Sequence, residues 1–295
     1  MFGDDAPEVP ENDATTAGST SDRAPHRPCS RLRLASIAAK LDQALIDGVA
    51  APEVPELTLA DGYTVQDHWA RLREGRGDER VGFKIGLTTP EARRPWGAVV
   101  PGRGILFSSV VKSSPAVIPT APCFTGFELE LAVRLSAEVR ATDSRESVRS
   151  KLGWAGLGIE VIGTRWSVPT RSLGAWAADN GMAAAAVLGA GCNSIALLPE
   201  LLEADFALET DATTRAGAAS RTLNDALDSV LWLAQDREAK GGRLEAGSLI
   251  LTGSIVGPVP TPEHGGRLVA RLGGFEPVEV RFDPSDGGAA PGGRG

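Results

Sequence analysis

Cysteine is scarce in this sequence, and its spacing argues against two classes of site. Among 295 residues there are three cysteines, Cys29, Cys123 and Cys192, which lie far apart. No two of them form a CxxC pair, the short spacing typical of zinc sites, and an odd, scattered set does not make a disulfide framework. The cysteines are therefore expected to be reduced thiols, as in cytoplasmic proteins.

Histidine is equally scarce, with three residues in the whole chain: His26, His68 and His264. A Ser-His-Asp triad or a histidine-rich metal site would have to use one of these positions. His68 falls within a predicted helix, where a histidine is usually a packing or surface residue, and His264 follows a proline in a predicted loop. Catalysis by histidine is therefore not the favoured mechanism.

An excess of positive charge is absent, and so is any long apolar run. Lys and Arg number 30 against 38 Asp and Glu, which gives a formal net charge of −8. Nucleic-acid-binding proteins usually present a basic face, and anionic lipids attract basic segments, so neither partner is expected. No run of about 18 apolar residues occurs, which predicts no membrane span. The first residues are acidic and polar, unlike a secretory signal, and a cytoplasmic location is expected.

The sequence does contain enough apolar material for a folded body. Hydrophobic residues make up 42% of the chain, and 35 glycines with 20 prolines indicate many turns around a strand-rich core. Residues 1–30 are rich in Asp, Pro, Ser, Thr and Ala without periodicity, and they are predicted to be a disordered N-terminal tail. Residues 284–295 are predicted to be a flexible C-terminal tail for the same reason. A single folded domain is therefore expected over residues 31–283.

Hydrophobic periodicity predicts both helices and strands within this domain. Apolar residues at helical spacing predict helices over residues 33–48, 62–74, 143–152 and 220–239. Alternating or continuous apolar runs predict strands over residues 80–89, 127–135, 156–162, 182–188, 247–252, 266–272 and 277–282. In the second helix, Val65, Trp69 and Leu72 are expected to share the buried face. Because helices come early and strands dominate later, an α+β fold with a large twisted sheet or roll is predicted.

The clearest chemical pattern is a pair of glutamates on the strand predicted over 127–135. Side chains two residues apart on a strand point the same way, so Glu128 and Glu130 can converge on one point. Glu160 lies in another apolar strand, where a charge must be paired or bound to a metal if it is buried. Carboxylate oxygens suit a hard dication such as Mg2+. The alternatives are a solvated strand face for the pair and an ion pair with Arg165 or another arginine for Glu160.

A lysine also interrupts an apolar strand. Lys84 lies between Phe83 and Ile85 in the segment VGFKIGLTT. Held among apolar groups near a metal, it could bind a carboxylate or an enolate, or carry a proton with a lowered pKa. The alternative is a strand lysine that points to water.

Five segments of the sequence, taken in order, resemble one known family. They are VGFKIGLTTP, FELELAVRL, GIEVIGTRW, ADNGMAAAAVLG and LTGSIVGPVP. A KIGLT segment, an ExE pair, a further glutamate and an LTGS segment at these separations resemble the 2-keto-4-pentenoate hydratase and 4-oxalocrotonate decarboxylase family. That family belongs to the fumarylacetoacetate hydrolase superfamily, and the resemblance extends from about residue 35 to residue 283.

The resemblance implies a fold and an assembly. The fold would be a fumarylacetoacetate hydrolase-like mixed β-roll with an N-terminal helical or α+β portion. Residues 31–283 would form one hydratase- or decarboxylase-like catalytic domain. The resemblance also implies a homo-oligomer, and association with a partner enzyme of the same pathway of aromatic catabolism.

Site residues follow from the same resemblance. Three glutamates would bind Mg2+ or Mn2+: Glu128, Glu130 and Glu160. Lys84 would be the active-site lysine, and the segment from Thr252 to Ser254 would lie against the carboxylate end of the substrate.

The implied activity is that of a divalent-metal-dependent lyase acting on an unsaturated 2-oxo acid. Such an acid can chelate a dication through its carboxylate and keto oxygens, and the dication then acts as a Lewis acid that stabilises a developing enolate. The same enolate supports hydration of a distal double bond, decarboxylation of a vinylogous 3-oxo acid, or C–C cleavage. The groups that handle protons and water distinguish these reactions.

The sequence departs from the hydratase pattern at two places. Gly102 stands where family hydratases commonly carry an Asp. The pair Asp179-Asn180 is followed by Gly181 and Met182, where family hydratases usually carry a Ser. Both changes remove groups that can move protons, so decarboxylation fits the residues better than ordinary hydration. A diverged member that acts on a bulkier or more apolar substrate is a further possibility.

Arg103 directly follows the altered glycine position. Its guanidinium could bind a second carboxylate or a phosphate of the substrate. The alternative is an ordinary arginine in a surface loop.

Functions of other classes also remain open at this point. A C–C bond hydrolase of the fumarylacetoacetate hydrolase type would use a His–Glu pair to activate water, and the sequence offers no clear equivalent. A non-catalytic subunit could keep the fold and the metal while supporting a partner enzyme, and a binding protein could hold a small dicarboxylate. The glutamates and Lys84 favour catalysis, whereas the missing Asp and Ser favour the non-catalytic alternatives.

Overall fold

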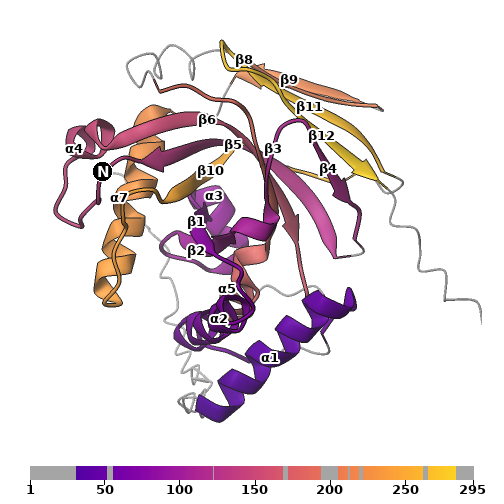
Figure 1. The fold of residues 1–295 in the computed structure, drawn as a ribbon, viewed down its shortest axis with the longest axis vertical. Coiled ribbons are helices and arrows are strands. Elements are labelled where there is room, and N and C mark those ends of the chain that lie inside the picture. The colour runs from indigo at the N-terminus through magenta and orange to yellow at the C-terminus, as the bar shows by residue number, and fades with distance from the viewer. Residues whose placement is uncertain are drawn as a thin grey trace, which may run out of the picture.

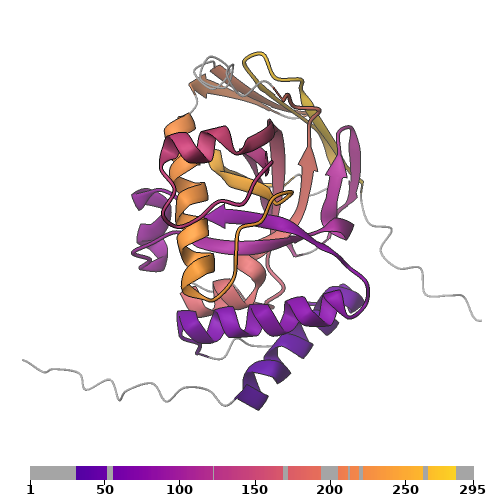
Figure 2. The same cartoon turned by 60° about the vertical axis from the view of Figure 1, so that its left-hand side comes forward.

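Two curled β-sheets and the helices packed against them make up the described part of the chain (Figures 1 and 2). The computed structural model describes residues 31–51, 56–121, 123–168, 172–193, 205–211, 213–218, 222–261 and 265–283. The predicted tails, residues 1–30 and 284–295, lie outside these ranges, as do His26 and His264. Within these ranges, no helix combines the length and the apolar character that crossing a membrane requires.

The larger sheet has seven strands and carries every acidic residue singled out by the sequence patterns. Its strand order is β2-β1-β10-β5-β6-β7-β3. The strands are β1 (Arg80–Gly86), β2 (Gly102–Phe107), β3 (Val111–Ser113), β5 (Phe124–Leu135), β6 (Leu152–Gly163), β7 (Ala183–Leu188) and β10 (Leu249–Val259). Neighbours from β10 to β7 are antiparallel, whereas β1 runs parallel to β10 and β3 parallel to β7, so the sheet is mixed.

The smaller sheet has five strands in the order β4-β12-β11-β8-β9. Its strands are β4 (Ala116–Pro119), β8 (Asp205–Thr210), β9 (Thr214–Ala218), β11 (Gly266–Leu272) and β12 (Val278–Asp283). It lies at the end of the molecule opposite α1 and α2 (Figures 1 and 2). The predicted strand-rich roll with helices early in the chain is confirmed as an α+β fold.

Three long helices surround the larger sheet, and shorter ones connect the strands. The long helices are α1 (Arg31–Asp47), α2 (Leu59–Glu74) and α7 (Leu223–Ala239). The short ones are α3 (Pro90–Arg93), α4 (Arg145–Ser150), α5 (Leu173–Ala178) and the 3-10 turns η1 (Arg94–Trp96), η2 (Ser108–Val110) and η3 (Asn180–Met182). The start of α7 is fixed by a capping box, in which the Thr222 and Asp225 side chains each accept a backbone N–H of the other residue.

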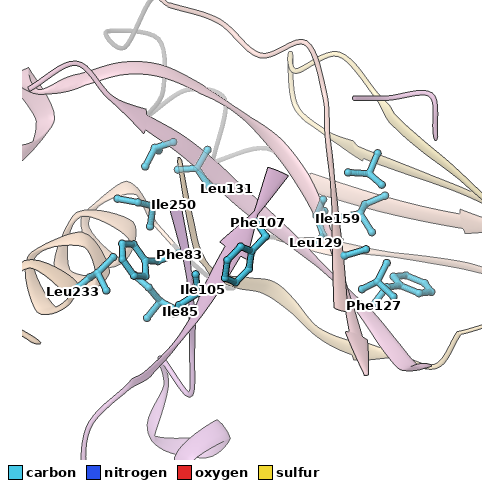
Figure 3. Close-up of a cluster of buried hydrophobic side chains, with 14 of the residues drawn as sticks. Phe83, Ile85, Ile105, Phe107, Phe127, Leu129, Leu131, Ile159, Leu233 and Ile250 are labelled. Carbon is cyan, nitrogen blue, oxygen red and sulfur yellow. The ribbon is translucent and has the colours of Figure 1, made fainter. Parts of the chain in front are cut away.

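One face of the larger sheet packs against the helices and the smaller sheet (Figure 3). Alternation along β5 places Phe127, Leu129 and Leu131 on this face, where all three are buried. The ring of Phe127 stacks on Phe282 of the smaller sheet, with 6.3 Å between centroids. Leu233 of α7 belongs to the same cluster. This continuous apolar core holds the strands that carry the site in fixed register.

The opposite face of the larger sheet carries the polar residues. Because side chains alternate along a strand, Glu128 and Glu130 point away from the core that holds Phe127 and Leu129. Farther along the strands, this face carries a second, separate group of aliphatic residues, the inner aliphatic cluster. It consists of Leu106, Ala132, Ala186, Leu188, Leu249 and Leu251.

β2 forms one edge of the larger sheet, and its outward backbone groups are bonded to side chains. Tyr63 accepts the N–H of Arg103 at 3.1 Å, and Gln66 donates to the Arg103 carbonyl at 3.2 Å. The amide of Asn180 accepts the N–H of Ile105 at 2.7 Å and donates to its carbonyl at 2.9 Å. These bonds join the edge strand to α2 and to η3.

Several predicted elements are confirmed, with changes at their ends. Helices over 33–48, 62–74 and 220–239 correspond to α1, α2 and α7, although Ser220 lies outside the described residues. Leu72 does not belong to the buried face of α2 as predicted, because it is 39% exposed while Trp69 and Ala70 fill that face. The strand predicted over 80–89 ends at Gly86, since Leu87 has a φ of 57° that no strand residue adopts.

Candidate active site

The three glutamates predicted to bind a metal converge on one point. Glu128 and Glu130 lie on β5, and Glu160 lies opposite Glu128 on β6, so neighbouring strands place all three on the same face. Each contributes a carboxylate oxygen to a set in which these atoms lie within 4.8 Å of one another. Glu130 and Glu160 are 0% exposed and Glu128 is half-buried, so the face that carries Glu128 and Glu130 is not a freely solvated one.

Burial and mutual repulsion raise the proton affinity of this cluster. Burial, followed by the negative charge of Glu160, raises the pKa of Glu128 to about 7, against the opposing effect of Lys84. For Glu130, burial and then the charges of Glu160 and Glu128 hold the pKa well above its ordinary value. The cluster therefore binds protons more readily than ordinary carboxylates do, because its three negative charges repel one another in a buried space.

Lys84 supplies one positive charge to the cluster. Its Nζ lies 3.1 Å from Oε1 of Glu160, and the side chain is buried rather than pointing to water. Burial alone would lower the pKa of Lys84, but the charges of Glu160, Glu128 and Glu130 outweigh it and raise the pKa above its ordinary value. The lowered pKa considered from the sequence is therefore wrong, and Lys84 is an ammonium ion at neutral pH.

The donors present do not satisfy the buried carboxylates. Oε1 of Glu130 and Oε2 of Glu160 have no hydrogen-bond donor within the described residues. A buried, unpaired carboxylate oxygen costs roughly several kcal/mol unless a cation or a donor compensates it, so these oxygens are suited to bind a cation. All-oxygen ligands suit a hard dication such as Mg2+ or Mn2+, and the residues therefore fit such an ion.

The segment predicted to contact the substrate lies beside the glutamate cluster and bonds to it through Gly253. Gly253, with a φ of 108° that favours glycine, donates its backbone N–H to Oε2 of Glu130 at 2.8 Å. The hydroxyl of Thr252 donates to the Leu131 carbonyl at 3.0 Å, and Ser254 donates to the Val256 carbonyl. A substrate contact for Thr252 or Ser254 stays a prediction.

An aromatic ring that the sequence did not reveal forms a wall beside Lys84. The Trp176 ring centroid lies 5.6 Å from Lys84 Nζ, a cation–π arrangement. A Cβ added to Gly102 would lie 2.3 Å from Cζ3 of this ring, and one added to Gly181 would lie 3.1 Å from it. An aspartate at position 102, as in the hydratase pattern, therefore does not fit beside Trp176 in this arrangement.

A left-handed turn holds Met182 near this wall. Asn180, Gly181 and Met182 all have positive φ, which is costly for the residues other than glycine and persists only where the surroundings impose it. The residue before the turn, Asp179, is held by a buried ion pair, 2.5 Å from its Oδ1 to Nε of Arg165. Arg165 thus pairs with Asp179, and the ion pair with Glu160 considered from the sequence is wrong.

Arg103 does not lie in a surface loop, because it is a fully buried residue of β2. Its Nε lies 2.8 Å from Oδ2 of Asp236 on α7, and its guanidinium bonds to Gln66 and stacks on Tyr63, both on α2. These contacts tie β2 to the two helices. A role in binding the substrate stays a prediction.

Histidine takes no part in the glutamate cluster within the described residues. His68 lies on α2, where its Nδ1 is 3.3 Å from a guanidinium nitrogen of Arg71. Within the described residues, the cluster of acidic groups close enough to share one metal ion is the set Glu128, Glu130 and Glu160. This arrangement offers metal-ligand and lysine chemistry rather than a His–Glu pair.

Comparison with known proteins identifies the family of the chain. Residues 103–283, more than half of the chain, match the family described as fumarylacetoacetate (FAA) hydrolase, C-terminal. The 2-keto-4-pentenoate hydratase of Burkholderia vietnamiensis is 29% identical over 268 residues, covering 84% of this chain and 97% of that protein. The 4-oxalocrotonate decarboxylase of Pseudomonas sp. strain CF600 is 26% identical over 264 residues, covering 87% and 99%.

A solved structure has the same fold over nearly the whole chain. The 4-oxalocrotonate decarboxylase from Pseudomonas putida G7, complexed with magnesium and adipate, superposes with a TM-score of 0.79 at 25% identity. The match covers 87% of this chain and 100% of that one. The predicted mixed roll is therefore confirmed, and the magnesium in that structure is consistent with the oxygen ligands found here.

Proposed function

Because the chain belongs to the fumarylacetoacetate hydrolase family, we propose that it is a divalent-metal-dependent lyase acting on an unsaturated 2-oxo acid. The relatives described above are hydratases and decarboxylases, and their names support a lyase rather than a C–C bond hydrolase. The observation that carries the proposal is the convergence of three glutamate oxygens within 4.8 Å beside a buried lysine.

Glu128, Glu130 and Glu160 are proposed to hold Mg2+ or Mn2+. When bound, the ion supplies Lewis-acid stabilisation of the negative charge that develops on a 2-oxo acid. Gly253 fixes the carboxylate of Glu130 through its N–H, so the ligand geometry is prepared before any ion arrives. Lys84 offsets part of the negative charge of the cluster and excludes a second cation from the same space.

Lys84 is proposed to be the catalytic residue. Its raised pKa keeps a proton on Nζ at neutral pH, and the Trp176 ring shields that ammonium from solvent. Loss of carbon dioxide from a distal carboxylate leaves the bonding electron pair in the conjugated 2-oxo system, where an ammonium is available to stabilise the charge or supply a proton.

Decarboxylation is proposed ahead of hydration. Hydration needs a group that activates water, and the positions where the hydratase pattern places an Asp and a Ser are Gly102 and the turn Gly181-Met182. The Trp176 ring occupies the space that a side chain at position 102 would need. This wall is apolar and glycine-lined, which suits a reaction that does not deliver water.

The protein is proposed to form a homo-oligomer and to act on a small-molecule 2-oxo acid. It is also proposed to associate with a partner enzyme of the same pathway. The fold shared with a decarboxylase over 87% of the chain supports a small-molecule substrate. Light scattering coupled to size exclusion measures the oligomer. The cytoplasmic location also stays a prediction from the sequence.

An ultraviolet assay tests the proposed reaction directly. Metal-free protein, with Mg2+ restored or withheld, is offered 4-oxalocrotonate and 2-hydroxy-2,4-pentadienoate in parallel, while carbon dioxide is measured. We expect Mg2+-dependent carbon dioxide release from the first compound and at least about 100-fold slower loss of the second, the smallest difference that a missing general base typically produces. Consumption of the dienol without carbon dioxide would show a hydratase, and silence on both would favour a non-catalytic subunit.

The stability of the metal-free protein should depend on pH through the same glutamates. The pKa of Glu128 is raised from 4.5 to about 7, so its contribution to stability is present below pH 4.5 and is lost as the pH rises through 7. That change corresponds to at most roughly 3 kcal/mol. Mg2+ binds the ionised carboxylates, so we expect it to raise the Tm more at pH 8 than at pH 6.

Differential scanning fluorimetry at the two pH values, with and without Mg2+, measures this difference. Glu128→Gln serves as the matched control, because an amide cannot titrate and the pH dependence of the Mg2+ effect should become smaller. An equal Tm increase at pH 6 and pH 8 in the unaltered protein would contradict the expectation.

A further inference from the structure

A polar cavity lies at the end of the larger sheet away from the glutamate cluster. Its volume is about 700 Å3, and it is lined by the first residues of β1, the end of β5, the last turn of α7 and the loop 241–248. Five charged residues line it: Arg80, Arg134, Arg237, Arg243 and Glu245. Four positive charges therefore face one negative charge around a space large enough for a small molecule.

This cavity is distinct from the glutamate cluster. Arg134 follows Glu130 by four residues on β5 and lies on the same face, roughly 13 Å farther along the strand. Ala132 lies between them and belongs to the inner aliphatic cluster, which fills the interval between the two polar groups. A ligand of the arginine-lined cavity therefore does not share the metal ligands.

Two of the four arginines already have carboxylate partners. Arg80 lies 3.0 Å from Oε1 of Glu74, and Arg243 lies 3.4 Å from Oε2 of Glu138. Arg134 donates to the Gly247 carbonyl at 3.0 Å but forms no ion pair with any described residue. The positive charge of the cavity is therefore not neutralised by the chain around it.

Arg237 is the least satisfied of the set. Its guanidinium packs over the Phe83 ring at 5.1 Å and against Gly242, whose added Cβ would lie 2.3 Å from a terminal nitrogen. Its Nε is buried without a hydrogen-bond acceptor in the described part of the chain. Burial, and then the positive charges of Arg103 and Arg80, lower its pKa more than the negative charges of Asp67 and Asp236 raise it.

We propose that this cavity is a binding site for a small anion that bears carboxylate or phosphate groups, held by Arg237 and Arg134. A planar guanidinium with a free Nε can form two parallel bonds to either group, and the strength of such charge-assisted bonds increases as water is excluded. The glycines at 241 and 247, where an added Cβ would meet no atom within 4 Å, leave room for the ligand beside the backbone. The site needs no metal and is independent of the proposed lyase activity.

Isothermal titration calorimetry on the full chain tests the site. The protein is stripped of metal on a chelating resin, and inorganic phosphate and glutarate are titrated separately, so the two arms distinguish the phosphate from the dicarboxylate source. We expect one site per chain for at least one probe. Arg237→Gln and Arg134→Gln are each expected to weaken binding by about tenfold or more, the loss that follows removal of a charged hydrogen-bond partner.

Two further variants make the result specific. Glu245→Gln removes the one carboxylate that lines the cavity, so it should tighten binding of the same probe. Arg281→Gln, at an exposed arginine on β12, should leave the Kd unchanged. Circular dichroism confirms that each variant is folded. Absence of binding by both probes, or equal Kd values for the unaltered protein and the Arg237 variant, would overturn the proposal.

Discussion

Replacement of Glu130 by glutamine is expected to lower kcat/KM for the preferred 2-oxo acid by about 10^3-fold or more. The reason is that Glu130 is proposed to hold the dication, and a bound dication stabilises the negative charge of the transition state by several kcal/mol. Glutamine has the same shape, and its carbonyl oxygen can still accept the N–H of Gly253. The change therefore removes the charge without removing the contact that orients residue 130.

The same variant should not destabilise the metal-free fold. Burial and the neighbouring carboxylates raise the pKa of Glu130, so ionised Glu130 costs free energy and a neutral amide relieves that cost. We therefore expect loss of Mg2+ affinity with an unchanged or higher Tm in the absence of metal. Opposite directions for activity and stability distinguish a metal ligand from a residue that merely supports packing.

Steady-state kinetics, calorimetric titration with Mg2+ and thermal unfolding measure these effects. Glu146→Gln, at an exposed position on α4, is the matched control and should change none of them. Activity within tenfold of the unaltered protein would contradict the assignment of Glu130. A Tm drop of many degrees in the metal-free variant would point to a structural role instead.

Replacement of Lys84 by methionine is expected to have two large effects. Removing one partner of a buried ion pair costs about 3–5 kcal/mol, because Glu160 then keeps a buried charge without its cation. Activity should fall by about 10^2- to 10^4-fold, the range for loss of a proton-transferring or charge-stabilising group. Methionine keeps the length and apolar packing of the lysine stem against Trp176.

Mg2+ separates the two effects of this variant. A dication restores positive charge beside the glutamates, so adding Mg2+ should recover most of the lost Tm. It should not recover kcat, because the ammonium group is still missing. Urea unfolding with and without Mg2+, together with saturation kinetics, gives both quantities. Lys112→Met, at an exposed lysine of β3, is the control, and full kcat in the Lys84 variant would contradict a catalytic role.

The glutamate pair illustrates what a sequence pattern can predict. Two carboxylates two residues apart in an apolar strand must share a face, and β5 places Glu128 and Glu130 accordingly. That Glu160 lies opposite Glu128 depends on the register between β5 and β6, which no local pattern determines. The sequence marked Glu160 only as a charge in an apolar strand, the resemblance to a known family grouped it with the other two, and the structure shows the register that brings it opposite Glu128.

Other parts of the fold depend on contacts between distant segments. β9 has the sequence TRAGA and is exposed along its whole length, so it has no apolar alternation to predict it. Arg103 was open to interpretation as a loop residue because its partners, Gln66 and Asp236, lie 37 and 133 positions away in the chain. Trp176 lies beside Lys84 because α5 packs there, and no sequence motif predicts this contact. The space for its ring depends on the absence of side chains at Gly102 and Gly181.

The hydrogen bonds along the outer side of β2 have a consequence for how the protein behaves at high concentration. An exposed sheet edge is a template on which a strand from another molecule can add, and this is a common route to aggregation. At residues 103 and 105 of β2, Tyr63, Gln66 and Asn180 already occupy the donors and acceptors that an added strand would need. The β2 edge of the larger sheet is therefore closed to intermolecular pairing, although β1 is the one described strand that pairs with β2.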